Sequence, residues 1–201
     1  LNHILNRNSI IEEISTILKD FESNCHNLNY KKGIYIYGSP GCGKTMFVNH
    51  VLEYLQYDMV KYDAGDVRNT SVIDDITKHN MSDKNIMSMF NKKIKKIAIV
   101  MDEIDGMNSG DKGGINSLIK LIRPKKTKKQ KLEEVTLNPI ICIGNYHIDK
   151  KIKELMKVCH TIELKTPTNE HINSLLISLN LTFEKSNSVK QKYLKKFNQI
   201  S

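Results

Sequence analysis

Short apolar runs alternate with segments whose apolar residues recur at helical spacing, from residue 9 to residue 164. The apolar runs predict strands, at 33–37, 58–63, 97–101, 139–143 and 160–164. The helically spaced segments predict helices, at 9–22, 44–56, 71–79, 85–90, 113–122 and 148–158. Strands that alternate with helices are typical of a parallel sheet covered on both faces, so the pattern predicts an α/β fold.

The pattern changes after Pro167. The segments 168–179 and 186–200 predict two amphipathic helices without a strand between them. We therefore expect a domain boundary close to residue 167. An α/β domain would occupy 1–166, and part of a smaller helical domain would occupy 167–201.

Composition adds a strong positive charge to this picture. Lys and Arg outnumber Asp and Glu by 31 to 22 in 201 residues, which gives a net charge of +9. A charge of this size favours polyanionic partners such as nucleic acid. Only Arg7, Arg68 and Arg123 are arginines, and the abundance of Lys, Ile and Asn also fits the codon bias of an AT-rich genome. Both explanations of the charge stay open at this point.

Cysteine usage and the length of the apolar runs exclude several classes of protein. The four cysteines, at positions 25, 42, 142 and 159, form no CxxC pair, so neither a disulfide scaffold nor a structural zinc site is expected. The apolar runs fall far short of the ~20 residues that cross a bilayer, and the first residues have no signal-peptide pattern. We expect an intracellular protein of a reducing compartment, with no membrane partner.

One glycine-rich segment carries the clearest chemistry. Residues 38–45 read GSPGCGKT and fill every position of the phosphate-loop pattern G-x-x-x-x-G-K-[ST], between a predicted strand and a predicted helix. Glycines let consecutive backbone N–H groups turn toward phosphate oxygens, and the following helix directs its positive end at them. Lys44 would reach the β- and γ-phosphates, and the hydroxyl of Thr45 would hold Mg²⁺. The predicted nucleotide-binding residues are Gly38, Ser39, Pro40, Gly41, Cys42, Gly43, Lys44 and Thr45.

Polar residues also follow two of the predicted strands. Asp102 and Glu103 come directly after the strand at 97–101, and Asn145 follows the strand at 139–143. The carboxyl ends of parallel strands meet at one edge of a sheet, where ligands bind. We expect Asp102 to hold Mg²⁺, Glu103 to act as general base on an attacking water, and Asn145 to orient that water or contact the γ-phosphate. The alternatives are a solvated strand end for the two acids and a turn residue for Asn145.

Together these segments resemble AAA+ ATPases, and in finer detail they resemble clamp-loader subunits. Three stretches are similar to the large subunit of replication factor C: 62–68 (YDAGDVR), 102–107 (DEIDGM) with 113–115 (GGI), and 141–145 (ICIGN). The resemblance implies a P-loop NTPase fold of the AAA+ type, with a parallel sheet flanked by helices and followed by the start of a helical lid. It implies catalytic roles for Lys44, Glu103 and Asn145, and a Mg²⁺ site at Thr45 and Asp102.

The resemblance also implies a function and partners. The chain would bind and hydrolyse ATP with Mg²⁺ as one of several clamp-loader AAA+ subunits in a ring. That ring would load a sliding clamp onto primer–template DNA, at a replication site in the nucleus or cytoplasm. Two other functions stay open: a degenerate subunit that binds nucleotide without hydrolysing it, and an AAA+ ATPase of helicase loading or DNA repair. The intact Lys44, Asp102 and Glu103 favour the hydrolysing subunit over the degenerate one.

The chain departs from the family pattern in two segments. Residues 155–159 (LMKVC) hold no arginine where small clamp-loader subunits carry an arginine finger, a lack that the large subunit shares. Residues 124–137 resemble an insertion, and they include the lysine-rich stretch 125–131. As a flexible loop, this stretch would contact DNA phosphates without reading sequence, through Lys125, Lys126, Lys128 and Lys129. The alternative is a solvated loop with no partner.

Overall fold

Five strands form one parallel sheet in the order β2-β3-β4-β1-β5. The computed structural model describes residues 5–63, 96–109, 112–133, 135–145 and 149–178. The strands are β1 (Gly33–Tyr37), β2 (Tyr57–Tyr62), β3 (Lys96–Met101), β4 (Ile140–Gly144) and β5 (Cys159–Glu163). Each begins and ends within one residue of the strand predicted for it, and the predicted parallel α/β fold is confirmed.

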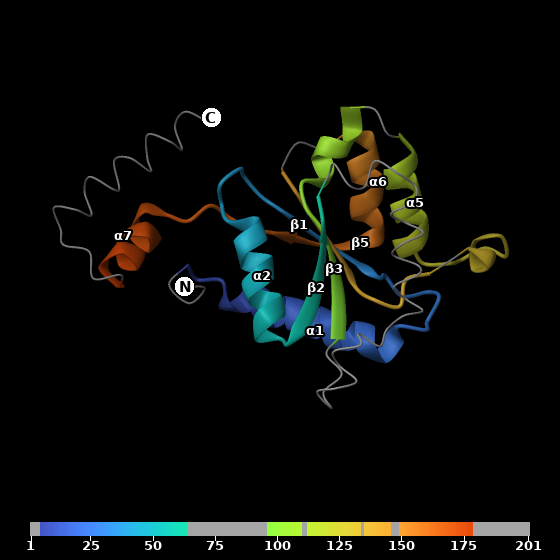
Figure 1. The fold of residues 1–201 in the computed structure, drawn as a ribbon, viewed down its shortest axis with the longest axis horizontal. Helices are drawn as coiled ribbons and strands as arrows, with labels where there is room; N and C mark the ends of the chain where they lie inside the picture. The colour runs from blue at the N-terminus through green and yellow to red at the C-terminus, as the bar shows by residue number, and fades with distance from the viewer. Residues whose placement is uncertain (1–4, 64–95, 110–111, 134, 146–148, 179–201) are drawn as a thin grey trace.

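Helices cover both faces of this sheet (Figure 1). The described helices are α1 (Asn8–Asn24), α2 (Lys44–Tyr54), α5 (Lys112–Ile122), α6 (Lys150–Val158) and α7 (Asn169–Ser178), with 3-10 helices η2 (Ile104–Ser109) and η3 (Gln130–Leu132). Strand side chains point alternately to the two faces. In β1, Ile34 and Ile36 pack in the core beneath α1 and α2, whereas Tyr35 packs in the core beneath α5 and α6. The sheet is therefore the middle layer of three.

The helices predicted at 71–79, 85–90 and 186–200 lie outside the described residues. The helix predicted at 168–179 is present as α7, which lies apart from the three layers and is joined to them by the segment after β5 (Figure 1).

The strand register brings three loops together. Tyr37, the last residue of β1, pairs with Gly144, the last residue of β4, and Met101 at the end of β3 pairs with Cys142 of β4. The segments that begin at residues 38, 102 and 145 therefore leave the same edge of the sheet. These are the three segments in which the sequence predicts functional residues.

Candidate active site

The phosphate loop turns sharply between β1 and α2, and its glycines make the turn possible. Gly41 and Gly43 have φ angles of 76° and 85°, which side chains rarely adopt. A Cβ atom on Gly38 would lie 2.3 Å from the carbonyl oxygen of Leu164, so this position has no room for a side chain. Gly43 is the N-cap of α2 and offers no side-chain cap, which leaves the first backbone N–H groups of the helix to another acceptor. The loop therefore has the shape and the donors of an anion cradle.

Arg7 stabilises this loop through contacts with Cys42 and Phe47. Its Nη2 donates a 2.7 Å hydrogen bond to the carbonyl oxygen of Cys42, and its guanidinium carbon lies 5.5 Å from the ring centre of Phe47. Arg7 is almost fully buried, and this burial lowers the pKa of its guanidinium. The sequence does not reveal this role, because a single arginine before a predicted helix belongs to no motif.

The side chains of Lys44 and Asn145 form a hydrogen bond at the cavity beside the loop. Lys44 Nζ donates to the carbonyl oxygens of Gly38 and Ser39 at 3.0 Å each, and to Oδ1 of Asn145 at 2.8 Å. Nδ2 of Asn145 in turn donates to Oδ2 of Asp105 at 2.8 Å. The structure thus brings together two predicted site residues and adds Asp105, which belongs to the same acidic segment as Asp102 but was given no role from the sequence.

Thr45 and Asp102 meet beside them. Thr45 Oγ1 donates to Oδ2 of Asp102 at 2.9 Å, and Nζ of Lys61 forms an ion pair with the same oxygen at 3.0 Å. The hydrogen bond with Asp102 is the main cause that raises the pKa of Lys61. A hydroxyl and a carboxylate are hard oxygen ligands, and Mg²⁺ takes one or two such protein ligands together with water and phosphate oxygens. The pair therefore fits the predicted Mg²⁺ site.

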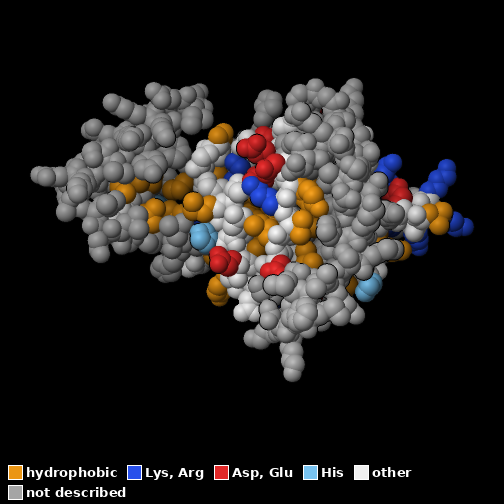
Figure 2. Space-filling view, viewed as in Figure 1, with side chains coloured by type: hydrophobic (Ala, Val, Ile, Leu, Met, Phe, Trp, Pro, Cys, Tyr) orange, Lys and Arg blue, Asp and Glu red, His pale blue; other side chains and the backbone are white. Residues whose placement is uncertain are grey.

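Lys61 was not predicted as a site residue. It lies near the end of β2 and also pairs with Asp63 Oδ1 at 3.3 Å. In the space-filling view, acidic and basic side chains adjoin each other near the upper ends of β2 and β3 (Figure 2). The alternation of Asp58, Val60 and Tyr62 with exposed Met59 and Lys61 marks an exposed strand face, but it does not indicate which acid a lysine would contact.

Glu103 has a strained backbone. Its φ angle is 52°, a left-handed value that costs a non-glycine residue on the order of 1–3 kcal/mol. Its N–H donates to Oδ1 of Asp102 at 3.0 Å, and its carbonyl oxygen accepts from the N–H of Gly106 at 2.8 Å. These bonds hold the turn in place and leave the Glu103 side chain exposed beside the cavity. Strain of this kind is common at functional sites.

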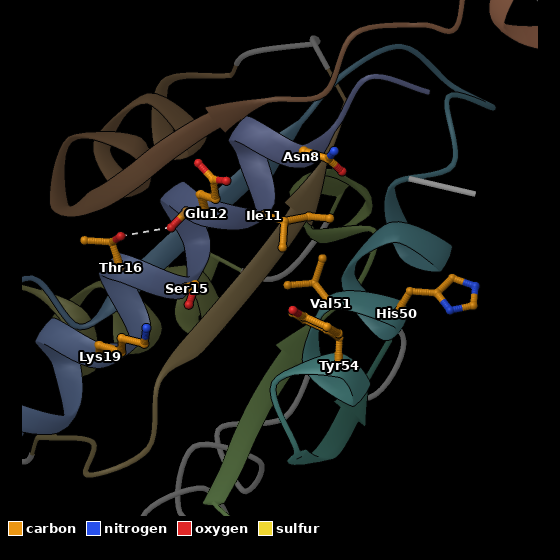
Figure 3. Close-up of a pocket in the computed structure, with 9 residues that line it drawn as sticks. All are labelled: Asn8, Ile11, Glu12, Ser15, Thr16, Lys19, His50, Val51 and Tyr54. Carbon is orange, nitrogen blue, oxygen red and sulfur yellow. Dashed lines mark hydrogen bonds between the residues drawn. The ribbon is translucent and has the colours of Figure 1, made fainter. Parts of the chain in front are cut away.

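A cavity of about 290 Å³ lies where these parts converge. The phosphate loop, the end of β4, Asn145 and the three acids Asp102, Glu103 and Asp105 line it. A larger hollow of about 710 Å³ lies between α1 and α2 (Figure 3). One of the hydroxyls that line this hollow, Thr16 Oγ1, donates to the Glu12 carbonyl oxygen of its own helix, and none of the predicted site residues lines the hollow. The smaller cavity is therefore the better candidate for chemistry.

The lysine-rich stretch is folded, which corrects one part of the prediction. Lys125 is fully buried, its Nζ donates to the carbonyl oxygen of Lys120, and it pairs with Glu133 Oε2 at 2.9 Å. The expected contact of Lys125 with DNA phosphates is therefore wrong, because its ammonium is enclosed. The other lysines are exposed: Lys126, Lys128, Lys129 and Lys131. Basic side chains project from this part of the molecule, near η3 (Figure 2).

Hydrogen bonds within the stretch keep it in a defined shape. The side-chain oxygen of Gln130 accepts from the N–H groups of Lys126 and Thr127, at 2.9 and 3.1 Å. Arg123 also pairs with Glu133, at 2.5 Å, and this hydrogen bond is the main cause that holds the pKa of Glu133 below its usual value. The exposed lysines therefore lie on a turn whose shape is held by the ion pairs of Glu133 and the hydrogen bonds of Gln130.

Among the residues that the structure describes, no helix has both the length and the apolar character needed to span a bilayer.

Known proteins resemble this chain over most of its length. Residues 34–166 match the ATPase family associated with various cellular activities (AAA). The replication factor C large subunit of Methanococcus aeolicus is 29% identical over 92% of this chain and 35% of its own length. Replication factor C subunit 1 is 30% identical in Saccharomyces cerevisiae, over 72% of this chain and 16% of that protein. The Homo sapiens subunit 1 is also 30% identical, over 74% of this chain and 12% of that protein.

A solved structure shares the fold. The structure of C. elegans PCH-2 aligns with a TM-score of 0.54 and 16% identity, over 86% of this chain and 46% of that chain. The present chain spans between 12% and 35% of the length of the three curated relatives above.

Proposed function

Because this chain belongs to the ATPase family associated with various cellular activities (AAA), we propose that it binds Mg-ATP at the 290 Å³ cavity and hydrolyses it as a clamp-loader-type subunit. One observation carries the proposal. Lys44, Thr45, Asp102 and Asn145 leave three different strand ends, yet hydrogen bonds of 2.8–2.9 Å join them in two pairs around one cavity. The similarity to replication factor C large subunits supports the clamp-loader type.

Each of these residues has a separate role in the proposed hydrolysis. Lys44 exchanges its present partners, Asn145 and the loop carbonyls, for the β- and γ-phosphates, aided by the N–H groups at the start of α2. Thr45 and Asp102 would hold Mg²⁺, which neutralises charge on the phosphate oxygens. Glu103 accepts a proton from a water whose oxygen bonds to the γ-phosphorus. The bond from that phosphorus to the β–γ bridging oxygen breaks, and ADP and phosphate leave.

Replacement of Glu103 tests this proposal. Glu103→Gln keeps the shape of the side chain and removes the base, so ATP turnover should fall by about 100-fold or more while ATP affinity is retained. Turnover and ATP binding are measured separately, with neighbouring ring subunits present. Glu53→Gln, on the exposed side of α2, is the matched control. Unchanged turnover in Glu103→Gln, or equal loss of binding and turnover, would contradict the proposed base.

The assembly and domain organisation are also part of the proposal. We infer a nucleotide-binding domain at 1–166 and a lid that begins with α7 in 167–201; the separation of α7 from the three layers supports this division (Figure 1). The partners are other clamp-loader AAA+ subunits, a sliding clamp and primer–template DNA, at a replication site in the nucleus or cytoplasm. The names of the relatives, replication factor C subunits, support these partners.

The exposed lysines near η3 are proposed as a binding surface for DNA phosphates. Lys126, Lys128 and Lys129 are exposed, and the residues from 126 to 132 include no acid that would neutralise them. Lysines bind phosphates as point charges and read no base sequence. Their affinity for DNA should therefore depend on salt and not on sequence.

A triple replacement tests this surface. Changing Lys126, Lys128 and Lys129 to Ala should weaken binding to a primer–template duplex and flatten the plot of log affinity against log salt, by roughly 0.9 for each phosphate that is no longer neutralised. The matched control removes three exposed lysines of α6, Lys150, Lys153 and Lys157. Equal salt slopes for the two triple variants would make the stretch a solvated insertion.

A further inference from the structure

The side-chain amide of Asn145 joins the phosphate loop to the acidic segment after β3. Its Oδ1 accepts from Lys44 Nζ and its Nδ2 donates to Asp105 Oδ2, each at 2.8 Å. A lysine ammonium can only donate and a carboxylate can only accept, so these two partners determine the orientation of the amide. The amide oxygen faces Lys44 and the phosphate loop, and the amide nitrogen faces Asp105.

The hydrogen bond from Asn145 matters to Asp105 because the other carboxylate oxygen of Asp105 is buried without a partner. Asp105 is half-buried in the first turn of η2, and its second oxygen, Oδ1, is buried without a hydrogen-bond partner. The hydroxyl of Tyr35 is also buried and unpartnered nearby: a Cβ atom on Gly144 would lie 2.2 Å from that hydroxyl and 3.5 Å from Asp105 Oδ1. A buried carboxylate oxygen without a partner is costly, so the bond to Asn145 is one that Asp105 is expected to keep.

We propose that Asp105 is a positioning residue that keeps the amide oxygen of Asn145 directed at the nucleotide, so that Asn145 accepts a hydrogen bond from the attacking water and does not donate one to the γ-phosphate. The inference rests on the proposed function and chooses between two roles that the sequence left open for Asn145. When Lys44 turns to the phosphates, Oδ1 of Asn145 loses its donor while Nδ2 stays bound to Asp105. The water that Glu103 deprotonates then supplies the new donor at this cavity.

A swap of the two side chains tests the orientation. In Asp105→Asn the acceptor-only partner of Asn145 is lost, and in Asn145→Asp two carboxylates face each other. In the double variant, residue 105 donates from its amide and residue 145 accepts, while an oxygen of residue 145 still faces Lys44 and the water. The direction of the hydrogen bond between residues 105 and 145 is reversed, and the negative charge moves from residue 105 to residue 145.

The expected results separate positioning from a general effect on structure. Each single variant should lose about tenfold or more in kcat, because a hydrogen bond to a charged group is lost. In Asp105→Asn, KM for ATP should stay within about twofold. The double variant should recover about tenfold over Asn145→Asp. Asp20 lies at an exposed position of α1, so Asp20→Asn makes the same change away from the cavity and serves as control.

Two results would overturn the inference. If the double variant stays as slow as Asn145→Asp, then restoring the hydrogen bond between residues 105 and 145 restores no activity, and Asp105 does not act by orienting residue 145. If Asp105→Asn keeps wild-type kcat, Asp105 positions nothing. Both results are interpreted only if Glu103→Gln has lost turnover. If Glu103→Gln keeps its turnover, the proposed function itself has failed.

A measurement on the nucleotide-free chain tests the hydrogen bond without any turnover. The side-chain amide protons of Asn145 should exchange with solvent more slowly than those of exposed Asn29 in NMR spectra, and Asp105→Asn should abolish this difference. Equal exchange rates for Asn145 and Asn29 in the wild-type chain would overturn the inference.

Discussion

The two ends of the sheet use the same side chain in opposite ways. At the carboxyl ends of the strands, the ammonium of Lys44 donates to two backbone carbonyls and an amide beside a cavity of about 290 Å³. At the amino ends, Lys32 donates to the carbonyl oxygens of Cys25 and Thr136, and Lys125 to that of Lys120. Lys32 and Lys125 are buried, at 3% and 0% exposure.

The comparison separates a lysine that is proposed to bind phosphate from two lysines that stabilise the fold. All three ammonium groups have backbone partners, so hydrogen bonding alone does not distinguish them. Lys44 is only half-buried and has room to exchange its partners for phosphate oxygens. Burial lowers the pKa of Lys32, as expected for a charge enclosed by protein. We therefore expect the space beside the ammonium, and not its present hydrogen bonds, to decide whether a lysine binds a ligand or stabilises the fold.

The largest expected effect is on ATP affinity, when Lys44 or Lys125 is replaced by an uncharged residue. Lys44→Ala should weaken Mg-ATP binding by at least about 100-fold, because charged hydrogen bonds to phosphate are lost, and should leave the unfolding transition nearly unchanged. Lys125→Met should leave ATP affinity unchanged. Nucleotide titration and urea unfolding of both variants check this, and equal ATP affinity in Lys44→Ala and wild type would remove the contrast between the two ends.

The next effect concerns the partner of a buried charge. Glu133→Ala takes the carboxylate away from fully buried Lys125 and should lower the free energy of unfolding by about 2 kcal/mol, since an enclosed ammonium loses its counter-charge. Adding Lys125→Met should restore most of this loss, because a methionine of similar shape needs no partner. Urea unfolding checks both, and a double variant as unstable as Glu133→Ala would show that the charge is not the cause.

A smaller effect is expected at the carboxyl end from Lys61. Its ammonium shares Asp102 Oδ2 with Thr45 and would therefore compete with a divalent cation at the proposed Mg²⁺ site for that oxygen. Lys61→Met should lower the Mg²⁺ concentration needed for half-maximal ATP binding by about two- to fivefold, the range of an exposed ion pair. Lys96→Met, which breaks an ion pair with Glu22 elsewhere, should leave the Mg²⁺ requirement unchanged. A higher requirement in Lys61→Met would mean that Lys61 helps to hold the phosphates.

The smallest effect is the pH dependence of the amino end. The hydrogen bond from Arg123 lowers the pKa of Glu133 below its usual value of 4.5, so the folded chain binds fewer protons there than the unfolded chain. The stability that Glu133 contributes is therefore present above pH 4.5 and is lost as the pH falls below it. The difference between wild type and Glu133→Gln in unfolding free energy should shrink by less than about 1 kcal/mol across this range. A difference that grows toward low pH would contradict this assignment.

The sequence predicted those features that depend on neighbours along the chain. The phosphate loop needs glycines at fixed spacing, and a buried parallel strand needs a continuous apolar run, so both can be recognised locally. Arg7, Lys61 and Asp105 are different, because their partners lie 35 to 41 residues away and only the folded chain joins them. Lys125 and Lys126 are identical neighbours in sequence, yet one is enclosed and one is exposed. The difference between them comes from Glu133, which pairs with Lys125, and from the packing around that pair.

The strand order has a consequence for how the chain is made. β1 pairs with β4 and β5, which follow it by more than 100 residues, and Gly38 at its end packs against the backbone of Leu164. During synthesis, this apolar strand therefore leaves the ribosome long before either of its neighbours exists. Pairing over such distances folds slowly and leaves apolar segments exposed to aggregation. The predicted phosphate loop, which follows β1, is therefore translated about 100 residues before β4 and β5, and it acquires its shape only after they have been made.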